Sequence, residues 1–212
     1  MDVLEQVTEI SVIPVVEIED ADSAVPLARA LASGGIRTME ITLRTDAALE
    51  AMRRVSGEVE GFLVGAGSIV SPEQIPIAVA AGAAYGVSPG WHPRLSDAAA
   101  ESALPYVPGV VTPSEVLDAA AHGHRRLKFF PAGNYGGGAT LRSFAGPFSS
   151  LGVAFMPTGG VTPANLSEFL SLPNVFAVGG TWIAPRPAIS AGDFTTIART
   201  AAEAARIAAD RS

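Results

Sequence analysis

The sequence predicts an α/β fold, a TIM (β/α)8 barrel, in a single domain that spans residues 1–212. Eight short stretches rich in β-branched and aromatic residues recur at roughly regular intervals along the chain. Alanine-rich stretches with helical periodicity lie between them, an alternation typical of parallel strands joined by helices. Eight strands favour a closed barrel over an open sheet. The alternative, a doubly wound sheet, needs a reversal of strand order that the sequence does not indicate.

The expected strands and helices alternate along the whole chain. In order, the strands are Ser11–Ile18, Thr38–Arg44, Phe62–Ile69, Tyr85–Pro89, Tyr106–Val111, Leu127–Pro131, Ala154–Thr158 and Val175–Val178. The clearest helices are Ala24–Ala32, Asp46–Val55, Pro72–Ala81, Pro163–Leu170 and Phe194–Asp210. Three dipeptides pair a helix-capping residue with a proline at the first helical position, namely Ser71–Pro72, Thr112–Pro113 and Thr162–Pro163. They indicate the carboxyl ends of the preceding strands, where barrel enzymes carry their chemistry.

The composition narrows the possible partners. No apolar run approaches the roughly 18 residues that a membrane span needs, and the acidic start MDVLEQVTEI lacks the basic region of a signal peptide. We therefore expect a cytoplasmic protein with no membrane partner. The net charge of −7 and the lack of a basic stripe argue against nucleic acid. Without cysteine there is no disulfide and no thiolate nucleophile.

One lysine stands out among the basic residues. Of the 14 basic residues only Lys128 is a lysine, and lysine, unlike arginine, can lose its proton and act as an amine nucleophile. Strand alternation puts Lys128 and Phe130 on one face, whereas Leu127 and Phe129 share the other. Desolvation among these apolar residues disfavours the ammonium form, as a Schiff-base nucleophile requires. The alternative is a structural lysine that extends from the strand end to water.

The second expected strand carries a carboxylate into the barrel. In MEITLRT the residues Glu40, Thr42 and Arg44 share one face, which points inward when Ile41 and its apolar neighbours pack under the helices. A buried carboxylate is costly unless it is paired or used. Two interpretations follow: a structural Glu40–Arg44 ion pair, or a proton-transfer group in Glu40 beside a carboxylate clamp in Arg44.

Two Gly-Gly pairs follow the last two expected strands, at Gly159–Gly160 and Gly179–Gly180. Paired glycine turns at these positions of a barrel commonly bind phosphate through backbone N–H groups. Either pair alone is weak support, because glycine is common at tight turns. No cluster of His, Cys or carboxylates has metal-ligand spacing, so we expect neither a metal nor another cofactor.

Together these stretches resemble the family of 2-keto-3-deoxy-6-phosphogluconate (KDPG) and 4-hydroxy-2-oxoglutarate (KHG) aldolases. The resemblance runs from about Val12 to the final helix. Six motifs carry it in order: EITLRT (Glu40–Thr45), VGAGS (Val64–Ser68), VSPG (Val87–Gly90), KFFPA (Lys128–Ala132), PTGGV (Pro157–Val161) and GGTW (Gly179–Trp182). The family usually has Thr in place of Ser68 and Ser in place of Thr181, and both exchanges keep the hydroxyl.

The resemblance implies a role for each motif. The catalytic residues would be Lys128, which forms the Schiff base, and Glu40, the general acid and base. Nine further residues would bind substrate. Arg44 and Ser68 would hold the pyruvate carboxylate, Thr158 would lie near the hydroxylated carbon, Gly159, Gly160, Gly180 and Thr181 would take the phosphate, and Pro89 and Phe130 would wall the pyruvate methyl. The implied partners are a phosphorylated keto acid, pyruvate, glyceraldehyde 3-phosphate and two further copies of the chain in a homotrimer.

Other functions remain open on the sequence alone. The expected reaction is class I cleavage of KDPG in Entner–Doudoroff-type sugar acid catabolism; the close alternatives are KHG and 2-keto-3-deoxy-6-phosphogalactonate as substrates. A barrel isomerase could use Glu40 as its base and Lys128 as an electrostatic partner. A phosphosugar-binding module would bind the same ligand without turnover.

Overall fold

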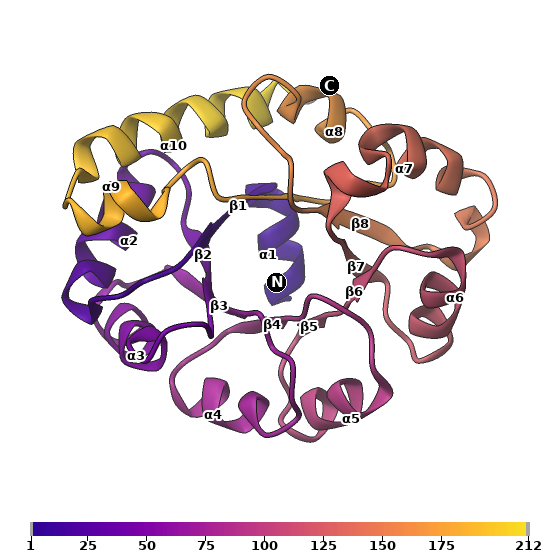
Figure 1. Cartoon of the computed structure of the whole chain (residues 1–212), viewed down its shortest axis with the longest axis horizontal. Helices are drawn as coiled ribbons and strands as arrows, with labels where there is room; N and C mark the ends of the chain where they lie inside the picture. Colours follow the sequence, from indigo (N-terminus) through magenta and orange to yellow (C-terminus); the bar gives the residue numbers. More distant parts are fainter. Residues whose placement is uncertain (1, 211–212) are drawn as a thin grey trace.

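The computed structural model describes residues 2–210 and consists of parallel strands surrounded by helices (Figure 1). The strands are β1 (Val12–Val16), β2 (Thr38–Thr42), β3 (Leu63–Gly67), β4 (Tyr85–Val87), β5 (Tyr106–Val107), β6 (Gly109–Val110), β7 (Arg126–Phe129), β8 (Ala154–Pro157) and β9 (Val178–Gly180). The α-helices are α1 (Val3–Ile10), α2 (Ala24–Ser33), α3 (Ala48–Glu58), α4 (Gln74–Ala80), α5 (Pro93–Glu101), α6 (Pro113–Ala121), α7 (Gly137–Ala145), α8 (Leu166–Leu170), α9 (Arg186–Ser190) and α10 (Phe194–Ala209). Short 3-10 turns are η1 (Ala21–Ser23), η2 (Ala132–Tyr135) and η3 (Ser149–Leu151).

The strands pair in sequential order, which confirms the α/β fold and excludes the doubly wound alternative. One sheet has the order β5-β4-β3-β2-β1-β9 and a second has the order β6-β7-β8, with every pairing parallel. A doubly wound sheet would reverse its order partway, whereas β1 to β5 follow one another without reversal and β1 also pairs with the last strand. In Figure 1 the helices α2 to α10 lie outside the strands, whereas α1 is seen in the middle of the ring that the strands form.

The expected ring of eight uninterrupted strands is not what the hydrogen-bonded sheets show. Pro108 divides the fifth strand into β5 and β6, because proline has no N–H to donate to a ladder. Its carbonyl still accepts from the Lys128 N–H at 2.8 Å. At the other junction, β8 meets the segment around β9 only through isolated bridges, Phe155–Val175 and Thr158–Gly179. The described residues therefore form two parallel sheets in place of one continuous ring.

The last strand begins later than the sequence indicates. Val175–Val178 was the expected strand, but β9 comprises Val178–Gly180 and continues through the Gly-Gly pair that sequence reasoning interprets as a turn. The reason is close packing: a Cβ placed on Gly179 would lie 2.3 Å from the Thr158 hydroxyl. Glycine inside a strand often marks such an approach.

Only one of the three predicted helix starts is correct. Thr112 caps α6, and its hydroxyl accepts a hydrogen bond from the Glu115 N–H at 3.3 Å. After Ser71 and Thr162 the helices begin later, because side chains inside the following turn bind the free N–H groups first. Gln74 accepts from the Ser71 N–H at 3.1 Å, and Asn165 accepts from the Thr162 N–H at 2.8 Å.

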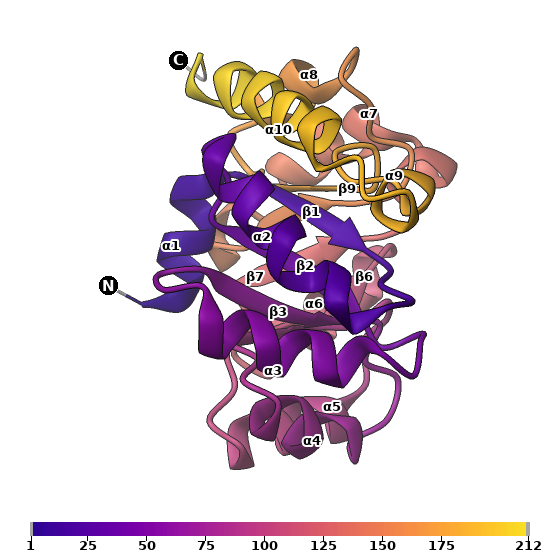
Figure 2. The ribbon, with the colours of Figure 1, turned by 90° about the vertical axis from the view of Figure 1, so that its left-hand side faces the viewer.

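The first helix, which the sequence analysis did not assign, lies at the end of the sheets where the strands begin. Figure 2 shows α1 beside the start of β1, with the carboxyl ends of the strands on the opposite side. Val7 of α1 is buried and belongs to an inner cluster that includes Ile13, Tyr85 and Met156. The helix α1 therefore packs against the inner side of the strands at the end where they begin.

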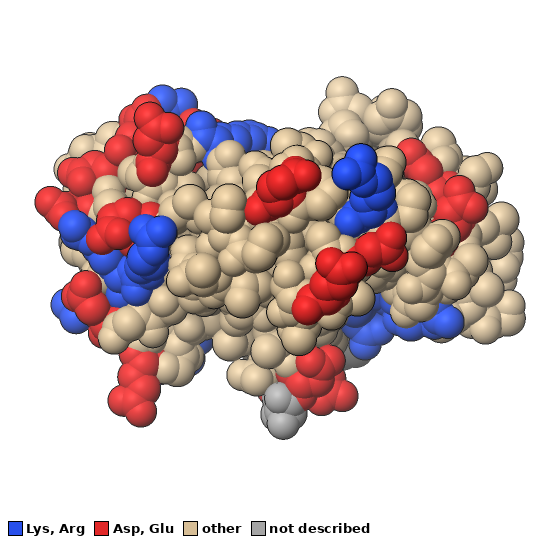
Figure 3. Space-filling model, turned by 90° about the horizontal axis from the view of Figure 1, so that it is seen from below, with Lys and Arg blue, Asp and Glu red and all other residues tan. Residues whose placement is uncertain are grey.

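Charged groups are scattered over the surface. Figure 3 shows acidic and basic side chains interspersed on the side that carries α4 and α5, with an uncharged area between them. The basic groups on this face are arginines, because the only lysine is buried. Among residues 2–210 no helix combines the length and the apolar character that crossing a membrane requires.

Candidate active site

A cavity of about 170 Å³ opens at the carboxyl ends of the strands. All the side chains and glycines that the sequence analysis assigned to a site line this one cavity: Glu40, Arg44, Ser68, Pro89, Lys128, Phe130, Thr158, Gly159, Gly160, Gly180 and Thr181. They come from β2, β3, β4, β7, β8 and β9 or from the turns that directly follow these strands. The strand ends therefore bring together residues that lie up to 141 positions apart, from Glu40 to Thr181.

Lys128 lies on β7 with its side chain turned into this cavity. Its neighbours Leu127 and Phe129 point the other way and pack in the main hydrophobic core, as alternation predicts. Lys128 is only 4% exposed, which excludes the structural alternative of a lysine extending to water. Its Nζ lies 3.1 Å from Oε1 of Glu40 and 5.3 Å from the centre of the Phe130 ring. The amine is thus held in a desolvated place where a ligand can reach it.

Glu40 is fully buried, and only one of its two carboxylate oxygens has a hydrogen-bond partner. Its Oε1 accepts from Lys128, but its Oε2 is buried without a hydrogen-bond partner. An unmet buried acceptor costs about 1–3 kcal/mol, so a carboxylate that keeps one oxygen free has to be explained by a ligand or a water molecule. Gly67 makes this position possible, since a Cβ there would lie 2.3 Å from Oε1 of Glu40. The alternation of β2 predicted the inward direction of Glu40 correctly.

The structural pairing of Glu40 with Arg44 is not found. The nearest acidic partner of Arg44 is Glu17, at 3.9 Å, and Glu17 makes a shorter contact of 2.8 Å with Arg186. An exposed pair of this length contributes about 0–1 kcal/mol. The Arg44 guanidinium at the edge of the cavity can therefore exchange Glu17 for the carboxylate of a ligand at little cost.

The Gly-Gly turn after β8 presents unused backbone donors. Gly159 and Gly160 have φ values of 87° and 82°, a conformation that glycine adopts without strain. Within residues 2–210 no hydrogen bond uses the N–H of either glycine, whereas both carbonyls accept bonds from outside the turn. Successive free N–H groups in a turn form a concave site for anions. The pair is suited to a phosphate group.

Hydroxyl groups lie around the rest of the cavity. Ser68 follows β3 with a φ of 57°, a strained conformation for a residue other than glycine that costs about 1–3 kcal/mol and commonly marks a functional position. Thr158 is 5% exposed and its hydroxyl makes only a long contact of 3.4 Å, to the carbonyl of Met156. Both side chains can bind the polar groups of a ligand.

Three further residues, which were not among the predicted site residues, also line this cavity: Val15, Thr42 and Val161. Gly179, the first glycine of the second predicted phosphate-binding pair, lines it as well. Two signals were available, because Thr42 lies between Glu40 and Arg44 on the same strand face and Val161 ends the motif PTGGV. Val15 gave no signal beyond its place in a buried strand.

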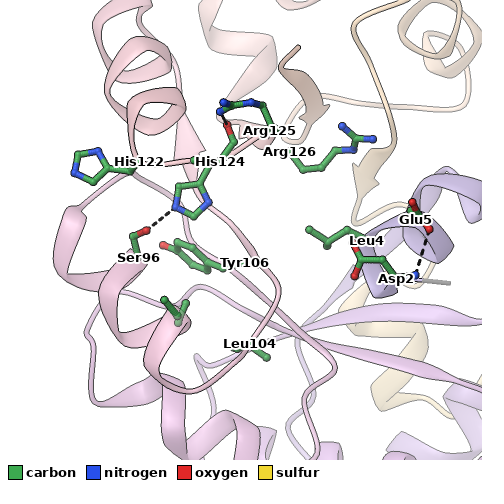
Figure 4. A pocket seen from close by; sticks show the side chains of 13 residues that line it. Asp2, Leu4, Glu5, Ser96, Leu104, Tyr106, His122, His124, Arg125 and Arg126 are labelled. Carbon is green, nitrogen blue, oxygen red and sulfur yellow. Dashed lines mark hydrogen bonds between the residues drawn. The ribbon is translucent and has the colours of Figure 1, made fainter. Parts of the chain in front are cut away.

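A second and larger cavity, of about 480 Å³, lies at the opposite end of the strands, next to α1. Figure 4 shows His124, Tyr106 and Ser96 on one side of it and Leu4 and Asp2 on the other. It contains no lysine, so its lining offers no side-chain amine for covalent chemistry. The chemistry therefore points to the smaller cavity.

The histidines serve structural roles. His92 caps α5, where its Nδ1 accepts from the Arg94 N–H at 3.2 Å. His124 bonds the Ser96 hydroxyl at 2.6 Å, and its pKa is lowered by burial and by the nearby charges of His122 and Arg125. Among residues 2–210 no group of three or more His, Asp or Glu side chains is arranged to hold a metal ion.

Known proteins resemble this chain in sequence and in fold. Residues 3–200 match the family model described as KDPG and KHG aldolase. The KHG/KDPG aldolase of Escherichia coli is 42% identical over 92% of each chain, and the 2-dehydro-3-deoxy-phosphogluconate aldolase of Pseudomonas aeruginosa is 42% identical over 92% of this chain and 88% of its own. The solved structure of KDPG aldolase from Legionella pneumophila, with pyruvate captured at low pH as a covalent carbinolamine intermediate, superimposes with a TM-score of 0.87 at 40% identity and covers 91% of this chain and 92% of its own.

Proposed function

Because the chain belongs to the family of KDPG and KHG aldolases, we propose that it cleaves 2-keto-3-deoxy-6-phosphogluconate to pyruvate and glyceraldehyde 3-phosphate through a Schiff base on Lys128. The observation that carries this proposal is the desolvated Lys128 amine, 3.1 Å from a buried carboxylate inside a cavity with an anion cradle. The enzyme is a class I lyase: carbon–carbon cleavage depends on an imine in place of a metal ion.

In the proposed mechanism, Lys128 attacks the C2 carbonyl of the substrate and the carbinolamine loses water to give an iminium. Glu40, acting through a water molecule bound at its free Oε2, removes the proton of the C4 hydroxyl. The C3–C4 bond breaks, its electrons enter the iminium to form an enamine, and glyceraldehyde 3-phosphate leaves. Glu40 then returns a proton to C3, and hydrolysis of the imine frees pyruvate and Lys128.

The other cavity residues would bind the two ends of the substrate. Arg44 and Ser68 would hold the keto acid carboxylate, with Pro89 and Phe130 against the methyl of pyruvate. At the far end, the cradle formed by Gly159, Gly160, Gly180 and Thr181 would bind the phosphate. This assignment is supported by the lining of the cavity, in which Arg44, the Lys128 amine and the glycine turns occur together.

The test of this function compares three substrates under one set of conditions: KDPG, its C4 epimer 2-keto-3-deoxy-6-phosphogalactonate, and KHG. We expect the highest kcat/KM for KDPG, because the glycine cradle offers binding energy to a phosphate that KHG lacks. A higher kcat/KM for KHG would assign the chain to the other activity of its family. Failure of all three to release pyruvate would contradict the proposed reaction.

Thr158 should report on the configuration at C4. We expect its hydroxyl to bind the substrate C4 hydroxyl, because the Thr158 oxygen faces the cavity with no short partner. Loss of this hydrogen bond in Thr158→Val costs about 1–3 kcal/mol, roughly ten- to a hundredfold in kcat/KM for KDPG. The galactonate epimer should be affected less, and an unchanged ratio between the two epimers would remove Thr158 from the binding site.

Turnover should be insensitive to EDTA. The cavity offers one lysine, one glutamate and hydroxyl groups, a donor set without the histidine and carboxylate clusters typical of metal sites. We expect full activity after dialysis against chelator, measured as pyruvate release with a class II aldolase as the positive control. Loss of activity that a divalent cation restores would overturn the imine mechanism.

We further propose that the protein works as a homotrimer in the cytoplasm, where phosphorylated metabolites are retained. Support for self-association comes from the surface: α4 has no charged residue, and Val70, Ile77 and Val79 are exposed near it. Exposed apolar groups that gather in one place commonly mark an interface. Sedimentation equilibrium would give the subunit number.

The mechanism favours a lyase over the isomerase alternative. An isomerase that uses Glu40 as base would need Lys128 only as a charge, and its activity would survive without imine formation. A binding module would take up the phosphorylated keto acid without releasing pyruvate. Borohydride trapping of an imine on Lys128, together with pyruvate release, separates the lyase from both alternatives.

A further inference from the structure

A buried hydroxyl anchors the turn that carries Pro89. Ser88, at the end of β4, is fully buried, and its Oγ donates to the Gly90 carbonyl at 2.7 Å. The same oxygen accepts from the Tyr106 hydroxyl at 2.6 Å and from the Gly109 N–H at 3.4 Å. A serine hydroxyl has one donor and two acceptor positions. Ser88 uses all of them, which fixes the turn at Pro89 to two neighbouring strand segments.

Tyr106 is itself held in place. It is 5% exposed, and burial raises its pKa to about 12, so the phenol stays protonated near neutral pH and can donate. Its ring packs edge-on against His124, with centroids 5.6 Å apart. Figure 4 shows Tyr106 next to His124 on the wall of the larger cavity, and Tyr106 is not among the residues that line the candidate active site. The tyrosine thus reaches Ser88 from the side opposite to the substrate.

The anchored turn packs directly on the strand next to Lys128. A Cβ placed on Gly109 would lie 2.3 Å from the carbonyl carbon of Pro89, so no side chain separates β6 from the turn. Gly109 is the partner of Lys128 in the ladder between β6 and β7. A displacement of Pro89 would therefore change the space beside the amine that forms the imine.

We propose that Ser88 and Tyr106 are positioning residues which hold Pro89 against the carbon next to the imine and thereby set the size of keto acid that the site accepts. This inference rests on the proposed aldolase function. Neither side chain lines the catalytic cavity, so both act through the turn. While the three hydrogen bonds of Ser88 hold the turn, Pro89 leaves no room for a keto acid with a group larger than methyl next to its carbonyl. Without these bonds Pro89 can move and the larger keto acid can bind.

The test measures exchange of the C3 protons of two keto acids with deuterium, followed by proton NMR. Exchange needs only the imine and the enamine, so it does not depend on the phosphate cradle. Pyruvate is compared with 2-oxobutanoate, which has one more methyl group. A hydrophobic pocket discriminates one such group by about 10- to 200-fold. In Ser88→Ala and in Tyr106→Phe we expect this preference for pyruvate to fall about tenfold, with exchange retained.

Two variants serve as matched controls. Tyr85→Phe removes a fully buried hydroxyl that contacts Thr38 at 3.0 Å, and Thr38→Val removes the other hydroxyl of the same contact. Both lose a buried hydrogen bond, as the test variants do, but neither contacts the Pro89 turn. We expect a comparable drop in melting temperature in all four variants and an altered preference only in Ser88→Ala and Tyr106→Phe. The double variant should show no further change, because both act through one oxygen.

The outcomes separate this inference from the proposed function. Wild-type protein that exchanges no pyruvate protons contradicts the aldolase mechanism itself. Wild-type exchange, together with an unchanged preference for pyruvate in Ser88→Ala and Tyr106→Phe, overturns the positioning role alone. An equal loss of preference in the Tyr85→Phe and Thr38→Val controls overturns it as well, since general loosening would then be sufficient.

Discussion

The Lys128→Arg variant is expected to lose both turnover and imine formation completely. Arginine keeps the positive charge beside Glu40 and most of the side-chain volume, but its guanidinium stays protonated and cannot attack a carbonyl. The ion pair with Glu40, at 3.1 Å in the wild type, can be maintained. We therefore expect a largely native circular dichroism spectrum together with no measurable pyruvate release. An active Lys128→Arg variant would overturn the proposed mechanism.

Borohydride trapping shows where the imine forms. Pyruvate and borohydride should convert the imine to a stable secondary amine, and Lys128 is the only lysine in the chain. The terminal α-amine is the one other primary amine, so it serves as an internal control for nonspecific labelling. We expect the adduct in the tryptic peptide that contains KFFPAGNYGGGATLR. An adduct on the α-amine alone would contradict the assignment, and the Lys128→Arg variant should give none.

Glu40→Gln is expected to lower kcat by about 10²-fold or more, the range for loss of a general acid and base. Glutamine keeps the shape and can present its amide oxygen to Lys128, so the melting temperature should change less than the rate. With the amide oxygen facing Lys128, the amide nitrogen takes the place of Oε2, the buried oxygen without a partner, and this nitrogen cannot accept a proton from the substrate. Imine trapping should persist in this variant, because Lys128 remains. Normal turnover would leave Glu40 as a structural partner of Lys128 only.

The alternation of strand residues made much of the site predictable from sequence. It gave the inward direction of Lys128 on β7 and of Glu40 on β2, and the outward direction of Leu127 and Phe129. The lone lysine and the Gly-Gly pairs then marked three strand ends that the fold brings together. Successive residues of a strand always point to opposite faces, so the two faces can be predicted from the sequence without knowledge of the tertiary structure.

The partners of these residues could not be predicted in the same way. On one strand, Glu40 and Arg44 share a face and suggested an ion pair; in the folded chain Glu40 meets Lys128, 88 positions away. Arg44 instead lies near Glu17, which Arg186 also binds. Such contacts cross between strands and loops, and spacing along one strand carries no information about them.

Backbone details escaped prediction for a related reason. Pro108 was included in an uninterrupted strand, although the missing N–H divides it into β5 and β6. The network of Ser88 and Tyr106 gave no sequence signal, because a serine next to a proline is common in turns. Its function becomes visible only when the distances to Gly90 and Gly109 are known.

Because the only lysine of the chain is buried, cleavage after this lysine measures how often the folded chain opens locally. A protease that cuts only after lysine has one cleavable bond in this protein, between Lys128 and Phe129 at the carboxyl end of β7. That bond can enter a protease only when β7 leaves its neighbours, so cleavage reports the population of the opened chain when reclosing is fast. A ligand that binds only the closed form slows the cut in proportion to its occupancy. Digestion thus yields a free energy of opening from one band on a gel, without any label.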